Sequence, residues 1–331
     1  MKTWNIAGIE IGNRYALAPL AGFTDYAMRK ISYDKGARLL YTEMESCEAL
    51  YYGSKLTIED IRQTKLDKEN CPEGKLALQI FGGKEESILK TIPLIEENGK
   101  YDFLDFNCGC PVPKVIKQRA GSYWLNREEE LLSLLRKMVS LSSKPVIVKI
   151  RIGYSEIKDI VPLALKIQDT GVQALAVHGR TRNEFFSSPV HYDVIRDIKN
   201  HLSIPVIANG EITQDNFLSV LSETQADAVM IGQHAIGYPK IFSDMIRKEE
   251  GLMKEETTLS GQLSDLKKHI DLIFSIKEEH SAASIMRSFA VNYMKGFSDS
   301  KKYRSLLVHC SSKKDYLNAI TQIEQECNIG H

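Results

Sequence analysis

The chain has 331 residues, of which 43% are hydrophobic and 26% are charged, and its formal net charge is zero. This composition indicates a folded globular protein with a full apolar core, and it excludes a chain coated in positive charge. The length allows one large domain with an appendage, or two domains. No apolar run approaches the roughly 20 residues that a membrane span needs, so we expect no membrane association.

The start of the chain and its cysteines predict a cytoplasmic protein. Residues 1–12 include charged and aromatic side chains and lack the apolar centre of a secretory signal. The six cysteines do not follow the spacing of a disulfide framework, which favours a reducing compartment. Cys108 and Cys110 could form half of a metal site, but no second pair with ligand spacing follows. We therefore predict no metal.

Short apolar segments rich in β-forming residues recur along the chain, with helix-length spacers between them. Most lack period-two alternation, which is typical of strands buried on both faces of a parallel sheet. Two spacers, Glu128–Leu141 and Ile157–Thr170, have the helical spacing of Leu, Ile and Val, and the second ends at Gly171, a helix-stopping residue. The predicted strands are Tyr15–Leu20, Arg38–Met44, Leu76–Phe81, Phe103–Asn107, Pro145–Ile152, Ala174–His178, Pro205–Asn209 and Ala228–Ile231.

Eight alternating strand and helix units predict an α/β fold, a closed (β/α)8 TIM barrel, over residues 1–245. The rival is an open doubly wound sheet, which is disfavoured because no GxGxxG follows the first strand. After Ile246 the β pattern disappears, and Glu249–Thr258 is charged and weakly patterned, as in a linker. Amphipathic helical spacing resumes from Leu263 and predicts a smaller all-helical domain over residues 258–331.

A turn with two thiols ends the fourth predicted strand, where residues 105–111 read DFNCGCP. Cys110 precedes a proline that stops the strand and fixes the backbone. A structural cysteine more often lies inside an apolar run, as a small hydrophobic residue. Cys110 is therefore well placed to meet a ligand bound above the sheet, with core packing as an equal alternative on this segment alone.

Other polar residues and small residues lie at the ends of the remaining strands, where a TIM barrel places its active site. Lys149 is the most informative, because an unpaired lysine inside a parallel strand costs several kcal/mol and requires an anion or a polar partner. Loops containing glycine after the seventh and eighth strands are suited to hold a phosphate with their backbone amides. A ligand with a phosphate at one end and a planar, electron-accepting part near Lys149 matches FMN.

Each strand-end residue also has a purely structural interpretation. Gln79 could satisfy neighbouring loop amides, and His178 alone is more often a structural histidine than a catalytic one. Asn209-Gly210 alone is an ordinary turn signal. The combination of polar residues at six strand ends favours a binding site over six separate structural roles.

Taken together, these motifs resemble the tRNA-dihydrouridine synthase family. The resemblance runs in order through nearly the whole predicted barrel and is looser over the helical tail. It implies an enzyme that uses FMN to reduce particular uridines of tRNA to 5,6-dihydrouridine, with NADPH reducing the FMN again after each turnover. The matching motifs are LAPLAGFT at 17–24, NCGCP at 107–111 with Lys114, Gly121 and Ser122, HGRTR at 178–182, IPVIANGEI at 204–212, and residues 227–232.

The resemblance also implies roles for individual residues. Cys110 would donate a proton to the substrate, so we expect no cation close enough to ionise its thiol strongly. The implied FMN contacts are Pro19, Leu20, Ala21, Gln79, Lys149, His178, Asn209, Gly210, Glu211, Gly232 and Gln233. The implied substrate contacts are Asn107, Arg180, Arg182, Lys301, Lys302 and Arg304.

The chain departs from the family pattern at three places. Cys108 stands where related sequences often have a larger apolar residue, and its role is left open. Gln233 stands where arginine is common, so phosphate contact there is expected from backbone amides. Tyr123-Trp124 replaces smaller residues and is expected near the substrate side, where it bears on how the uridine is positioned.

The predicted helical domain has an uneven charge distribution. Between Ser284 and Lys314 there are seven basic residues and one acid, Asp299. Such a stretch suits contact with a phosphate backbone, and we predict that residues 258–331 bind tRNA. The alternative is a solvated helix face, balanced by acidic residues upstream.

Three other functions remain open on the sequence. One is an FMN-dependent oxidoreductase of a free pyrimidine, which would not require the basic helical tail. The second is a non-catalytic RNA-binding protein, and the third is an aldolase that forms an imine at Lys149. We expect a monomer. The sequence does not decide which tRNA uridine is reduced, or between NADPH and NADH.

Overall fold

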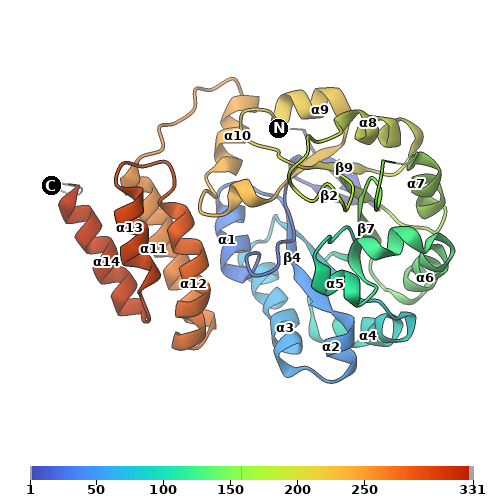
Figure 1. Cartoon of the computed structure of the whole chain (residues 1–331), viewed down its shortest axis with the longest axis horizontal. Helices are drawn as coiled ribbons and strands as arrows, with labels where there is room; N and C mark the ends of the chain where they lie inside the picture. The colour runs from blue at the N-terminus through green and yellow to red at the C-terminus, as the bar shows by residue number, and fades with distance from the viewer. Residues whose placement is uncertain (1, 158, 328–331) are drawn as a thin grey trace.

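Eight parallel strands form a closed barrel in the computed structural model, which describes residues 2–157 and 159–327. The strand order around the barrel is β10-β3-β4-β5-β6-β7-β8-β9, so the predicted (β/α)8 barrel is confirmed (Figure 1). Each predicted strand overlaps an observed one, and the first ends earlier than expected, at Leu17. The barrel strands are β3 (Tyr15–Leu17), β4 (Leu39–Ser46), β5 (Lys75–Phe81), β6 (Phe103–Cys108), β7 (Val146–Arg151), β8 (Leu175–His178), β9 (Val206–Asn209) and β10 (Ala228–Ile231).

Helices cover the outside of the barrel, and their ends follow the local sequence. The side chains of Asp25 and Ser54 accept hydrogen bonds from the first turns of α1 and α3, where backbone donors lack helical partners. The observed α6 coincides with the predicted Glu128–Leu141, and α7 is shorter than its prediction. The outer helices are α1 (Tyr26–Asp34), α2 (Cys47–Tyr51), α3 (Lys55–Asn70), α4 (Glu85–Asn98), α5 (Pro113–Lys117), α6 (Glu128–Leu141), α7 (Val161–Gln168), α8 (Tyr192–His201), α9 (Phe217–Thr224) and α10 (Ile241–Glu249).

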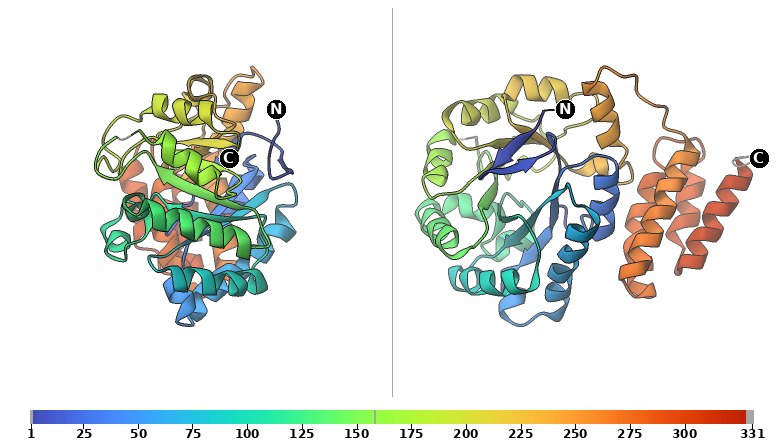
Figure 2. Two further views of the ribbon diagram at one scale, coloured as in Figure 1. Left: turned by 90° about the vertical axis from the view of Figure 1, so that its right-hand side faces the viewer. Right: turned by 180° about the vertical axis from the view of Figure 1, so that it is seen from behind.

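A short antiparallel hairpin of β1 (Trp4–Ile6) and β2 (Ile9–Ile11) lies across one end of the barrel, as the right-hand view of Figure 2 shows. Its buried side chains, Ile6 and Ile11, join the cluster of small and apolar residues that fills the barrel interior. This end is therefore closed by apolar packing. The opposite end, at the carboxyl ends of the strands, is the one that the hairpin leaves accessible.

Four further helices form a bundle beside the barrel, next to α1 (Figure 1). They are α11 (Leu259–Ile276), α12 (Glu279–Tyr293), α13 (Ser300–Val308) and α14 (Lys313–Glu326). The ring of Phe289 on α12 packs edge-on against Phe23 of the β3–α1 loop, 5.3 Å between centroids. An ion pair of 2.7 Å joins Lys35 to Asp265 across the same boundary. Within the described residues, no helix is both long and apolar enough to cross a membrane.

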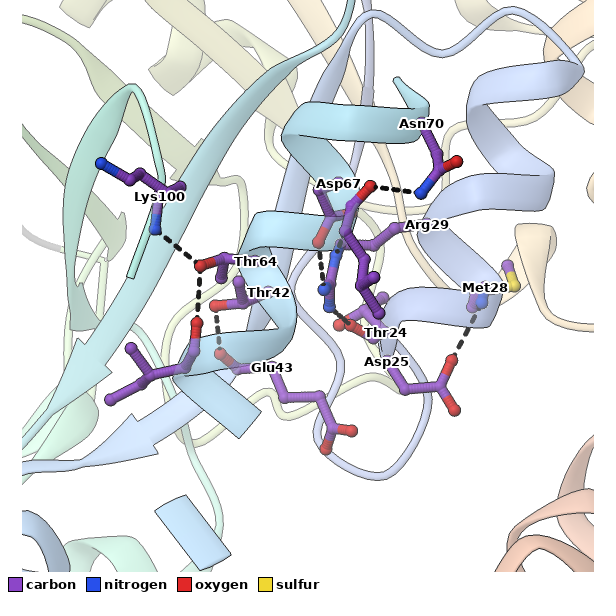
Figure 3. A network of polar contacts seen from close by, with 12 residues as sticks. Thr24, Asp25, Met28, Arg29, Thr42, Glu43, Thr64, Asp67, Asn70 and Lys100 are labelled. Atoms are coloured by element: carbon purple, nitrogen blue, oxygen red, sulfur yellow. Dashed lines mark hydrogen bonds and ion pairs between the residues drawn. The ribbon is translucent and has the colours of Figure 1, made fainter. Parts of the chain in front are cut away.

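A buried ion pair joins α1 to α3, and the same arginine of α1 also holds the β3–α1 loop (Figure 3). The guanidinium of Arg29 donates to both carboxylate oxygens of Asp67, at 2.9 and 2.6 Å, and also to the backbone oxygen of Thr24 at 2.6 Å. The hydroxyl of Thr24 in turn accepts the backbone N–H of Leu20 at 2.9 Å. The loop at the open end of β3 is therefore held by buried polar contacts.

Candidate functional site

A cavity of about 420 Å³ opens at the carboxyl ends of the barrel strands. Its size falls within the range of small-molecule and cofactor sites. One side is apolar and includes Ala18 and Phe23, and the other carries cationic and amide groups. The predicted site residues that line it are Pro19, Leu20, Ala21, Asn107, Cys110, Lys149, His178, Arg180, Asn209, Gly210, Glu211, Gly232 and Gln233.

Gln79 lies outside this lining, fully buried inside the barrel. Its amide nitrogen donates to a carboxylate oxygen of Asp105 at 2.6 Å, and its amide oxygen accepts from Asn107 at 2.9 Å. Both polar groups are thus occupied by side chains of one neighbouring strand, β6. Burial raises the pKa of Asp105 to about 8, although the Gln79 hydrogen bond and nearby Lys149 oppose the shift. Contact between Gln79 and a flavin stays a prediction.

The Cys110 turn is held by side chains on both sides of it. The side-chain oxygen of Asn107 accepts the backbone N–H groups of Gly109 and Cys110, at 3.1 and 2.9 Å. The backbone oxygen of Cys110 accepts from both the N–H and the hydroxyl of Ser122, at 3.1 and 2.9 Å. Gly121 has a φ of +61°, and a Cβ there would lie 2.7 Å from that same oxygen. Any larger residue at Gly121 would displace the turn.

The two thiols of this segment have different surroundings. Cys110 is half-buried and lines the cavity, whereas Cys108 is fully buried in the layer between strands and helices. Burial raises the pKa of Cys110, and the opposing charges of Lys149 and Arg151 do not reverse that shift. A raised pKa is the direction that the expected role of Cys110 as an acid requires. Cys108 packs as a small hydrophobic residue among apolar neighbours.

Lys149 and His178 form the polar wall of the cavity together with Asn209. The Lys149 ammonium donates to the side-chain oxygen of Asn209 at 3.0 Å, which is the polar partner that the sequence required. Burial, reinforced by Arg151, lowers the pKa of Lys149 to about 8. Burial and the three nearby cations lower the pKa of His178 to about 2, so its ring is neutral at pH 7. Its Nε2 is buried and has no partner within the described residues.

The sequence places Arg151 with Lys149 at the end of the fifth predicted strand but assigns it no contact, and in the structure it lines the cavity. It is 2% exposed. Its guanidinium donates to the backbone oxygens of Gly109, Thr181 and Phe185, at 2.9, 2.8 and 2.8 Å. It therefore ties the loop after β6 to the loop after β8. The signal that could have found it is its spacing of two from Lys149, which puts both side chains on the same face of β7.

The loops after β9 and β10 lie at the end of the cavity where the sequence predicts a phosphate. Within the described residues, the backbone N–H groups of Gly210 and Glu211 have no hydrogen-bond partner. Gly210 has a φ of +127° and Glu211 one of +45°, an uncommon conformation for a non-glycine residue. The Glu211 carboxylate pairs with Arg180 at 2.8 Å. Free backbone donors beside one another are the feature that an anion site requires.

Several predicted substrate contacts lie away from the cavity lining. Arg182 stacks over the ring of Tyr154 at 5.4 Å instead. Lys301, Lys302 and Arg304 lie on α13 in the separate bundle, and Lys302 pairs with Glu326 at 2.7 Å. Their contact with a substrate stays a prediction. Among the described residues, no group of three or more His, Cys, Asp or Glu is placed to hold a metal.

Tyr123-Trp124 is expected near the substrate side, but neither residue lines the cavity, and Trp124 is buried in the core. The side chain is 1% exposed, and its indole N–H donates to the backbone oxygen of Gly82 at 2.8 Å. The ring packs edge-on against Phe106 behind the Cys110 turn, so its size serves the core. Its neighbour Tyr123 is partly exposed and packs against Tyr154, with 6.3 Å between ring centroids.

Comparisons with known proteins agree with this geometry. Two solved structures, "Crystal structure of TcOYE with pHBA" and "Structure of morphinone reductase in complex with tetrahydroNAD", have TM-scores of 0.56 and 0.54. At 14% and 13% identity, covering 79% of this chain and 95% and 93% of theirs, they establish a shared fold alone.

Sequence relatives are more specific. The tRNA-dihydrouridine synthase B of Pasteurella multocida is 31% identical over 321 residues, 95% of this chain and 94% of the relative. The protein of the same name from Escherichia coli is 36% identical over 242 residues, 72% of this chain and 73% of the relative. The family described as dihydrouridine synthase (Dus) matches residues 16–328. The chain belongs to the dihydrouridine synthase family.

Proposed function

We propose that this protein is a tRNA-dihydrouridine synthase that reduces the C5=C6 bond of specific tRNA uridines, using FMN that NADPH recharges. The observation that carries the proposal is that the Cys110 thiol lines the same cavity as Lys149 and as His178, whose buried Nε2 has no partner within the described residues. The names of the sequence relatives support the choice of tRNA as substrate.

The cavity residues fit FMN. The small side chains of Ala18 and Ala21 allow a planar ring to lie close to the backbone. The unpartnered Nε2 of His178 needs a polar group from a ligand, because a buried polar atom without a hydrogen bond is costly. The free N–H groups of Gly210 and Glu211 suit the phosphate end. When bound, reduced FMN supplies a hydride for C6 of the uracil ring.

Lys149 would keep a positive charge beside the ring system. With a pKa of about 8, its ammonium is mostly protonated at neutral pH, although burial disfavours the charge. Negative charge that develops on the ring would be stabilised by that ammonium. Asn209 holds the ammonium at 3.0 Å and so fixes its position on the cavity wall.

Cys110 would donate the second hydrogen, as a proton to C5. Addition of a hydride to C6 leaves an enolate, and the thiol S–H can protonate it. A cysteine used as an acid must be protonated before the reaction, and the raised pKa of Cys110 meets that demand. This is the reverse of a nucleophilic cysteine, whose pKa is lowered.

The helical bundle would bind the tRNA body. The target base must leave its stack to reach a cavity inside the barrel mouth, at a cost of a few kcal/mol. Phosphate contacts from the bundle could offset this cost. Lys301 is exposed and Arg304 partly so, and neither forms an ion pair within the described residues, unlike Lys302.

The test is product formation by the purified protein with FMN and NADPH. An unmodified tRNA transcript should yield dihydrouridine, and free uridine at the same concentration should not. Product from free uridine alone would favour the free-pyrimidine oxidoreductase. No product from either substrate, or a purified protein that binds no FMN, would refute the proposal.

A further inference from the structure

Two pairs of exposed or partly exposed rings lie on the loops that follow β6, β7 and β8, and one of the four rings, Phe186, lines the cavity. This aromatic rim consists of Tyr123, Tyr154, Phe185 and Phe186, from the loops after β6, β7 and β8, with Arg182 stacked on Tyr154. Phe185 and Phe186 are 41% and 43% exposed, so burial in a core does not explain them. An exposed group of aromatic side chains at the edge of a site marks a contact surface.

Phe186 connects the rim to the cavity. Its ring lies 6.1 Å from the ring of His178 and 5.2 Å from the guanidinium carbon of Arg151, both of which line the cavity. Phe185 packs edge-on against Phe186, with 4.8 Å between centroids, and lies on the outer side of it. Phe185 therefore lies one ring away from the cavity lining, where a nucleotide next to a base in the cavity could reach it.

The backbone of Phe185 gives an independent reason to assign it a ligand. Its φ is +54°, in the left-handed region that a bulky side chain rarely adopts. The loop is held in this conformation from below, because Arg151 donates to the backbone oxygen of Phe185 at 2.8 Å. Glycine would satisfy the same backbone with less strain. Folding therefore does not require a phenyl ring here, and strain of this kind clusters at binding sites.

The rim carries one cation that suits a polyanion, Arg182, although the exposed acids Glu156 and Asp159 also lie in the loop after β7. Arg182 presents its guanidinium over the ring of Tyr154 at 5.4 Å. The acid of the β8–α8 loop, Glu184, is turned inward, where it accepts the backbone N–H of Thr181 and contacts His191 at 2.6 and 2.7 Å. Rings beside a guanidinium are the combination that stacks on nucleobases without reading their sequence.

We propose that the aromatic rim, with Phe185 as its outermost ring, stacks on an unpaired nucleobase next to the uridine that enters the cavity. This inference rests on the proposed function, since it assumes an RNA substrate. A base held on Phe185 would keep the neighbouring nucleotide from restacking and so favour its extrusion into the cavity.

The direct test compares Phe185→Gly and Phe185→Asn with the wild-type protein. Both replacements tolerate a positive φ, so the thermal midpoint should stay the same or rise. Binding of an unmodified tRNA transcript, measured without NADPH, should weaken about 5- to 150-fold, the value of one stacked base. Phe185→Trp should restore it. Ile157→Ala is the matched control, because Ile157 is a 46% exposed aliphatic side chain in the neighbouring loop, and it should bind as wild type.

A second arm identifies the stacked base. Transcripts with one abasic nucleotide, placed immediately 5′ or 3′ of the uridine that the wild type modifies, should bind more weakly to the wild type at one of the two positions. Phe185→Gly should show no further drop in affinity at that position. Two results would overturn the inference. One is unchanged tRNA binding by Phe185→Gly and Phe185→Asn. The other is that, at both positions, the abasic nucleotide lowers the affinity of Phe185→Gly as much as it lowers the affinity of the wild type. Wild-type protein that makes no dihydrouridine would instead refute the proposed function.

Discussion

The two ends of the barrel interior differ in chemistry, although the same strands build both. At the closed end the inward side chains are apolar, and they include Phe103 on β6 and Ile147 on β7. Two and four residues further along, the inward positions are polar or charged. They are Asp105 and Asn107 on β6, and Lys149 and Arg151 on β7. A step of two residues keeps the side chain on the same face, so each strand changes from apolar to polar toward the mouth.

The closed end of the barrel therefore contributes mainly to stability, and the mouth carries the candidate site. Burial of apolar surface at the closed end stabilises the fold, and the β1–β2 hairpin completes it. At the mouth, lowered pKa values at Lys149 and His178 and an unpartnered Nε2 are unfavourable for the free protein. Groups of this kind at a cavity are expected where a ligand completes their contacts.

The largest effect on stability should come from the closed end. Phe103→Ala removes a fully buried ring and should lower the free energy of unfolding by about 3–5 kcal/mol. The same change at the mouth, Phe186→Ala, removes a 43% exposed ring and should cost less than about 1 kcal/mol. Denaturant titrations of both variants measure this. Equal costs at the two ends would remove the distinction on which the comparison rests.

A smaller loss of stability should follow from Asn107→Ala at the mouth. The backbone N–H groups of Gly109 and Cys110 would lose their acceptor, at about 1–3 kcal/mol for each group that water does not reach. The Cys110 turn should also become mobile, which amide hydrogen exchange of Gly109, Cys110 and Ser122 detects. Protection that is the same as in the wild type would show that Ser122 and Gly121 hold the turn without Asn107.

Lys149→Met should raise the free energy of unfolding of the flavin-free protein, because it removes a buried ammonium. Lys149 has a folded pKa of about 8, below the unfolded value of about 10.4, so the unfolded state binds more protons between these pH values. Wild-type stability should therefore gain from rising pH across this window, and the variant should lack that gain. FMN retention should fall in the variant. Denaturant titrations from pH 7 to 10 measure how the free energy of unfolding of each protein depends on pH. An identical pH slope in the wild type and the variant would contradict the prediction.

The smallest effect concerns the helical bundle. Replacing Lys301 and Arg304 by Gln should reduce the salt dependence of tRNA binding, by about 0.7–0.9 in slope for each phosphate that the variant no longer neutralises. Lys302→Gln is the control, because its ammonium already pairs with Glu326 at 2.7 Å. Binding measured at a series of salt concentrations gives the slopes. If all variants share the wild-type slope, α13 is ordinary solvated surface.

Much of the barrel could be predicted because its strands are continuous apolar runs of limited length, separated by helical spacing. Lys149 could be predicted as a site residue because an unpaired lysine inside a buried strand needs a polar partner or an anion, whereas the role of His178 is implied by the family resemblance. The β1–β2 hairpin escapes prediction, since two three-residue strands are too short to show a period.

The misses have a common cause, which is that sequence adjacency does not show which way a side chain points. Trp124 follows the Cys110 region in the chain, yet it turns into the core and bonds Gly82. For Gln79, whose contact with a flavin stays a prediction, the sequence likewise does not show that Asp105 and Asn107 occupy its amide. The positive φ of Phe185, on which the rim proposal depends, is set by the contact of Arg151 from another strand.

The most direct test of the account is the rate at which tRNA reoxidises the reduced, FMN-loaded enzyme in a single turnover. Cys110→Ala should lower this rate by about 100- to 10,000-fold while keeping FMN and tRNA binding, as expected for removal of a general acid. Cys108→Ala removes the neighbouring thiol from the core and should keep the rate. An unchanged rate in Cys110→Ala, or an equal decrease in Cys108→Ala, would contradict the assignment of Cys110 as the proton donor.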